Sequence, residues 1–126
     1  MTDTPTPHQL ELAVEDTREA VRLQVADGDH LLFSARLEGP ELDELIRGLS
    51  QARAQLADQV APELDEGARL ADVVSDPSYL IGKNSGTVEA LLALRHPGYG
   101  WLGFRLRRPV VEQIVVRLGD WLGGRL

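Results

Sequence analysis

Alternation of apolar and polar side chains with a period of two is the feature that most restricts the fold of this chain. Leu10, Leu12 and Val14 fall on one face of residues 9–14, with other side chains between them, which is typical of a strand with one buried face. Helical spacing begins after Gly39-Pro40, since proline is tolerated in the first turn of a helix. The elements expected in this part are strands over residues 9–14, 21–25 and 30–37 and a helix over residues 40–59.

The same order of segments returns after residue 77. Strands are expected near residues 79–81, 88–94 and 102–106, and a second helix is expected from Pro109. Aligning the two parts so that Arg36 falls on Arg105 also places Pro40 on Pro109. This order indicates tandem units of three strands and one helix, related by duplication. Convergent patterning of two similar units is the alternative.

The predicted fold class is therefore α+β, with one or two antiparallel sheets packed on two long amphipathic helices as a tandem pseudo-repeat. The predicted organisation is a disordered tail over residues 1–8 and a single domain over residues 9–126, with pseudo-repeats 9–60 and 78–123 and a connector 61–77. Within the connector, the pattern favours a short helix that starts near Asp65 over an extra strand.

Charge is distributed unevenly along the chain, whose formal net charge is −7. Residues 1–75 carry a balance of −10 and residues 76–126 a balance of +3, so only the second part tolerates a polyanion. Mutual attraction of the two parts, or plain solvation of the charges, is the alternative interpretation. The chain has no cysteine, its first residues lack the pattern of a signal peptide, and no apolar run approaches about 20 residues. We expect a cytoplasmic protein with no membrane partner.

The last predicted hairpin carries the surface with most chemical character. Pairing Leu94 with Leu102 keeps one face apolar, whereas a slip of one residue buries charged side chains. The opposite face then pairs Arg95 with Trp101, Leu91 with Arg105 and Glu89 with Arg107, and Tyr99 stands at the loop tip. The candidate interaction residues are Arg95, Tyr99, Trp101, Arg105 and Arg107.

Three interpretations of these residues stay open. Bases of a single strand can stack on aromatic rings while arginines follow the phosphates. Arg95 can instead close the hairpin by a cation–π contact with Trp101, beside a Glu89–Arg107 pair. Tryptophan and arginine are also enriched in protein interfaces, which is the third interpretation.

The order of elements resembles that of the PUR-repeat and whirly-type folds, which implies binding of single-stranded nucleic acid. Small size, low isoelectric point and mixed strands and helices are also similar to secretion chaperones of pathogenic bacteria, which implies a protein partner. No motif residue accompanies either resemblance, so neither transfers a binding site to this chain.

No pattern in the chain predicts a catalytic residue, a cofactor or a metal. His8, His30 and His96 lack a second ligand at helical spacing, and Gly82-Lys83 lacks the upstream glycine of a phosphate loop. The predicted function is a non-catalytic protein-interaction module, acting as an adaptor, regulator or secretion-type chaperone and as a homodimer. Binding of single-stranded nucleic acid is the alternative, and a small-ligand-binding protein or an enzyme without a readable motif comes third.

Overall fold

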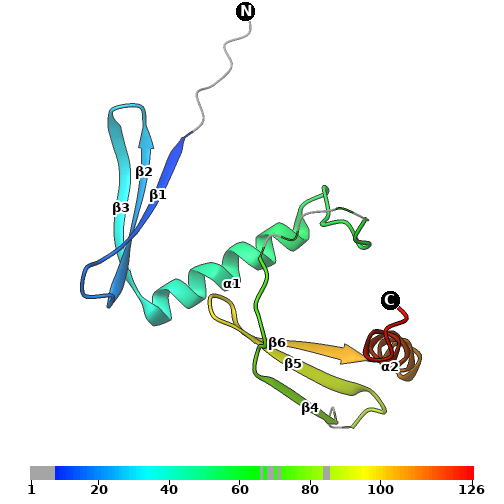
Figure 1. The fold of residues 1–126 in the computed structure, drawn as a ribbon. Helices are drawn as coiled ribbons and strands as arrows, with labels where there is room; N and C mark the ends of the chain where they lie inside the picture. Colours follow the sequence, from blue (N-terminus) through cyan, green and yellow to red (C-terminus); the bar gives the residue numbers. More distant parts are fainter. Residues whose placement is uncertain (1–7, 66, 68–69, 71, 84–85) are drawn as a thin grey trace, which may run out of the picture. The chain divides into compact units, whose positions relative to one another are not determined.

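The computed structural model describes residues 8–65, 67, 70, 72–83 and 86–126. The chain divides into two units, Met1–Glu63 and Leu64–Leu126, and each is described by itself. Each unit contains three antiparallel strands followed by a helix, in the order shown by Figure 1. The α+β class, with two three-stranded sheets and two helices, is therefore confirmed.

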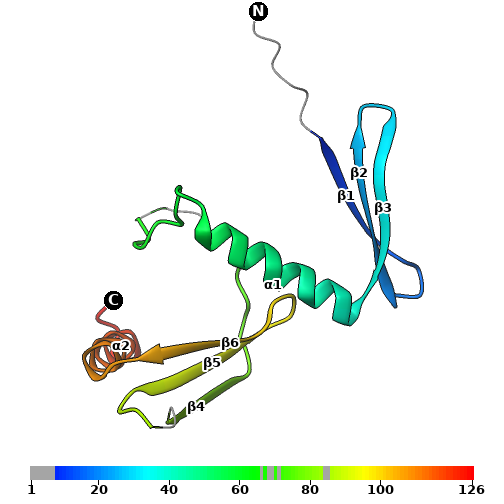
Figure 2. The ribbon, with the colours of Figure 1, turned by 180° about the vertical axis from the view of Figure 1, so that it is seen from behind.

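The first sheet has the order β1-β2-β3. Its strands are β1 (Gln9–Val14), β2 (Ala20–Asp27) and β3 (His30–Glu38), which lie side by side in Figure 1 and Figure 2. Leu12 lies opposite Leu23, which lies opposite Ala35, so the predicted apolar side chains share one face, here called the inner face. The β2–β3 turn uses Gly28 with a φ of +59°, a conformation that glycine adopts without steric cost.

Helix α1 (Gly39–Gln55) follows β3 directly, with Pro40 in its first turn as expected. The predicted end at residue 59 is wrong, because the helix stops at Gln55. The Gln59 side-chain amide donates to the carbonyl oxygens of Ala54 and Leu56, and these two carbonyls are thereby satisfied without a further helical turn.

The second sheet has the order β4-β5-β6, with β4 (Tyr79–Lys83), β5 (Ala90–His96) and β6 (Gly100–Leu106). Leu94 pairs with Leu102 and Arg95 with Trp101, which confirms the predicted register. The expected strand start at Val88 is wrong, since β5 begins at Ala90 and Val88 is fully exposed. Helix α2 (Arg108–Leu122) follows, with Pro109 in its first turn.

The connector contains neither helix nor strand in its described residues. Residues 66, 68–69 and 71, over which the short helix was predicted, lie outside the described part, as do residues 1–7 of the predicted tail. In the described part of the chain, no helix is long and apolar enough to cross a membrane.

The inner faces of both sheets are largely exposed in this structure. Leu12 of the first sheet is 62% exposed and Phe104 of the second is 47% exposed, and Ala20 is the only described apolar residue that is fully buried. The chain has an accessible surface of 11582 Å², whereas two compact bodies of half its length would expose roughly 8000 Å². The packing of the helices on the sheets and the internal duplication accordingly remain predictions.

Candidate protein interface

The candidate residues lie on or beside one face of the second sheet, the face opposite to Leu92 and Phe104. Strand pairing defines its rows: Leu80 lies beside Ala93, which lies beside Gly103. The outer face consists of the residues that alternate away from the inner face, namely Leu80, Gly82, Leu91, Ala93, Arg95, Trp101, Gly103 and Arg105.

The centre of this outer face is apolar. Leu80 is 58% exposed and Trp101 is 56% exposed, and Leu91 and Ala93 are half-buried between them. A Cβ atom added to Gly103 would stand 3.7 Å from Cδ1 of Leu91, so the Leu91 side chain reaches toward the space that glycine leaves open. The result is a continuous apolar patch across all three strands.

The corresponding face of the first sheet is different, although its strands pair in the same way. Its side chains are mainly polar, namely Gln9, Glu11, Arg22, Gln24, Ser34 and Arg36, beside the apolar Ala13, Ala26 and Leu31. Strand β5 instead contains the uninterrupted run Ala90-Leu91-Leu92-Ala93-Leu94. Such a run is typical of a strand that is covered on both faces, whereas an antiparallel sheet with one wet face alternates.

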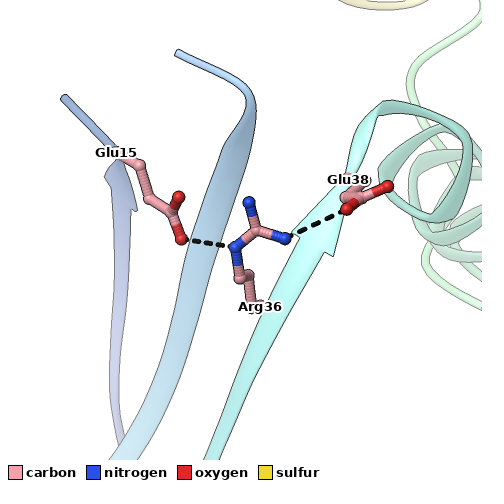
Figure 3. A network of polar contacts seen from close by, with 3 residues as sticks. All are labelled: Glu15, Arg36 and Glu38. Atoms are coloured by element: carbon pink, nitrogen blue, oxygen red, sulfur yellow. Dashed lines mark hydrogen bonds and ion pairs between the residues drawn. The ribbon is translucent and has the colours of Figure 1, made fainter. Parts of the chain in front are cut away.

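The arginines of the two outer faces also differ in their partners. In the first sheet, Nε of Arg36 donates to Oε1 of Glu15 at 2.8 Å and Nη1 donates to Oε1 of Glu38 at 3.0 Å (Figure 3). The hydrogen bond with Glu15, followed by that with Glu38, raises the pKa of Arg36 above its ordinary value. Arg36 is thus held by two carboxylates of its own unit.

The second sheet lacks these two carboxylates. Arg105 occupies the position that corresponds to Arg36, and the positions of Glu15 and Glu38 are there taken by Asn84 and Arg107. Among the described residues, neither Arg105 nor Arg107 forms an ion pair, and Arg95 forms none either. The outer face of the second sheet therefore joins an apolar centre to the guanidinium groups of Arg95 and Arg105, with Arg107 just beyond the sheet, and none of the three has an acidic partner in the described structure.

The purely structural interpretation of this hairpin is not supported. Arg95 and Trp101 are cross-strand neighbours, but within the described residues no cation–π contact joins them. Glu89 lies before β5 and forms no ion pair with Arg107 in the same part of the chain.

Tyr99 belongs to a different arrangement, in the β5–β6 turn. Nδ1 of His96 accepts the backbone N–H groups of Gly98 at 2.9 Å and Tyr99 at 3.1 Å. Its other ring nitrogen, Nε2, therefore carries the proton and donates to Oδ2 of Asp72 at 2.7 Å. The Tyr99 ring packs against His96 with centroids 4.6 Å apart, so Tyr99 supports the turn while remaining 61% exposed.

Sequence reasoning therefore finds the charged and aromatic border of the surface and misses its centre. Leu80, Leu91 and Ala93 were absent from the candidates, although the unbroken apolar run in β5 is a signal that points to Leu91 and Ala93. The His96–Asp72 hydrogen bond joins residues that are far apart in the sequence and has no local signal.

Other chemistry is sparse. No group of three or more His, Cys, Asp or Glu side chains that could hold a metal occurs in the residues that the structure describes. A hollow beside α2, lined by Pro109, Glu112 and Val116, is wide open to solvent. No protein-family model, curated protein or solved structure matches this chain.

Proposed function

We propose that this chain is a non-catalytic protein-interaction module that presents the outer face of its second sheet to a partner protein. The observation that carries the proposal is that this sheet is apolar on both faces. One apolar face suffices to attach a sheet to a helical layer. A second one costs free energy in water unless another molecule covers it.

The composition of the outer face favours a protein over a nucleic acid. Interfaces between proteins are enriched in tryptophan and arginine around a dry centre, which fits Trp101, Arg95 and Arg105 around Leu91 and Ala93. A single-strand binder needs several rings on which successive bases stack. The outer face as defined by its strand pairing offers one ring, that of Trp101, and its other side chains are aliphatic or arginine. An adaptor, a regulator and a secretion-type chaperone all meet this description.

The proposal extends to a homodimer with amphipathic helices. Leu49 of α1 is exposed, Leu42, Leu45 and Ile46 of the same helix are half-buried, and inner-face side chains such as Leu12 are exposed. In a dimer, the apolar stripes of the helices of two copies would cover the inner sheet faces. The inner faces and the helix stripes would then both be removed from water, as in a layered α+β protein. Common origin of the two units is supported by their pairing, because every β5–β6 pair from Ala90–Leu106 to Leu94–Leu102 has a β2–β3 counterpart at the aligned positions.

Light scattering after gel filtration tests the dimer, whose mass should be twice that of a single chain. Capture from an extract of the native host, treated with nuclease, tests the interface. We expect at least one protein that wild type and Trp121→Ala retain and Trp101→Ala loses. The two tryptophans are similarly exposed and both lie in the second unit, so Trp121→Ala is a matched control. A monomer would refute the dimer, and a partner retained equally by both variants would refute the interface.

A further inference from the structure

The arginines of the outer face stand at opposite ends of its apolar centre. Arg95 pairs with Trp101 at one end, and Arg105 pairs with Leu91 at the other. Four residues along the ladder separate these two rows, which is about 13 Å at the rise of a β-strand. Arg107, two residues beyond Arg105, extends the positive charge past the end of the sheet.

These charges indicate what the partner carries. In the first sheet, the guanidinium of Arg36 is matched by two carboxylates. A partner that covers the second outer face must also supply acceptors, because a guanidinium that is desolvated without one costs free energy. A second copy of the same face is a poor match, since a twofold contact would bring its arginines together. The occupant is therefore acidic where it meets the rim and apolar in the middle.

The dimensions favour a helix. Three strands about 4.8 Å apart make a surface roughly 10 Å wide, which one α-helix covers with its side chains. Carboxylates seven or eight residues apart lie on the same side of a helix and about 10–12 Å apart along its axis. That spacing is close to the distance between the rows of Arg95 and Arg105.

We infer that the outer face of the second sheet binds an amphipathic helix whose apolar stripe is bordered by carboxylates seven or eight residues apart. The inference rests on the proposed function and names the chemistry of the partner. Leu80, Leu91, Ala93 and Trp101 receive the stripe, and Arg95 and Arg105 pair with the two carboxylates. Burial of the stripe supplies most of the affinity, and the ion pairs select among stripes of similar hydrophobicity.

Three labelled 18-residue peptides test the inference against the full chain by fluorescence anisotropy. They share a leucine stripe and carry glutamate, glutamine or lysine at the two bordering positions. We expect the glutamate peptide to bind about tenfold more tightly than the lysine peptide at low salt, with a smaller ratio at high salt. Arg105→Glu should abolish that preference, because Arg95 then attracts one carboxylate while the introduced glutamate repels the other, and the double variant Arg95→Glu/Arg105→Glu should reverse it. Arg22→Glu, a mid-strand arginine on the outer face of the first sheet, is the matched control and should leave the order unchanged.

Circular dichroism of each variant confirms folding, and Arg95→Glu, which should also abolish the preference, replaces Arg105→Glu if that variant unfolds. Equal affinity for all three peptides, or an order that Arg105→Glu leaves unchanged, overturns the inference. So does tighter binding of a labelled oligodeoxythymidylate than of the glutamate peptide, which would favour nucleic acid. If no peptide binds while a host protein is still lost on Trp101→Ala, the helical acidic partner is refuted and the proposed function stands.

Discussion

The imidazole of His96 is expected to fix the β5–β6 turn, and His96→Ala measures how much it contributes. The substitution removes two hydrogen bonds from the backbone N–H groups of Gly98 and Tyr99 and one to Asp72. The His96 side chain is only 18% exposed, so the two backbone bonds contribute about 1 kcal/mol each, whereas the bond to the 59%-exposed Asp72 adds little. We expect the second unit to lose about 2 kcal/mol of unfolding free energy.

Urea unfolding followed by tryptophan fluorescence is the appropriate assay, because Trp101 and Trp121 both belong to the second unit and the first has no tryptophan. His30→Ala is the matched control, since His30 also borders a hairpin turn, as the first residue of β3, but is exposed. His96→Asn should restore part of the loss, because an asparagine oxygen accepts backbone N–H groups in turns. A loss no larger than that of His30→Ala would refute the hydrogen-bonding argument.

Two further predictions concern the same hairpin. Gly100 has a φ of +80°, so Gly100→Ala should lower the unfolding free energy by about 1 kcal/mol. Gly98→Ala, at an ordinary φ, should leave the unfolding free energy nearly unchanged. Equal decreases in the melting temperature of the two variants would contradict this prediction. Arg107→Glu places a carboxylate at the position that corresponds to Glu38, which pairs with Arg36 in the first sheet. The new carboxylate should pair with Arg105 and lower the affinity of the glutamate peptide several-fold. An unaltered affinity in the anisotropy titration would contradict this pairing.

The strands and their register were predictable because one physical constraint specifies both. A slip between β5 and β6 by one residue would have moved Arg95 to the inner face, so the apolar pattern alone selects the pairing of Leu94 with Leu102. The irregularity between Val25 and Ala26 in β2 was not predictable in this way. The shift places Leu31 opposite Ala26 and Phe33 opposite Val25, so the Leu31 and Phe33 side chains fall on different faces although simple alternation puts them on the same one.

Helix ends and turn contacts were less predictable, because they depend on a few specific hydrogen bonds. Residues up to Gln59 have side chains compatible with a longer α1, but Gln59 satisfies the carbonyls of Ala54 and Leu56 instead of continuing the helix. Asp72 and His96 are 24 residues apart in the sequence, and their hydrogen bond forms only in the folded chain. Neither contact follows from periodicity, which describes faces and not individual atoms.

The candidate surface was predictable at its border and not at its centre for a related reason. Arginine and tryptophan are residue types that are enriched in interfaces, so Arg95, Trp101 and Arg105 could be identified from the sequence directly. Alternation assigns every apolar residue in phase to the core, and the out-of-phase Leu80, Leu91 and Ala93 then read as ordinary strand residues. They become informative only when the two sheets are compared face by face.

That comparison separates what the two units share from what distinguishes them. Their inner faces are apolar in the same register, as expected of positions that must attach each sheet to the rest of a fold. Their outer faces have opposite character: one is polar and matches Arg36 to its own glutamates, and the other is apolar with Arg105 unmatched among the described residues. Attachment of each sheet to its helix accounts for an apolar inner face only. We therefore propose that the apolar and cationic character of the second outer face reflects a partner from outside the unit.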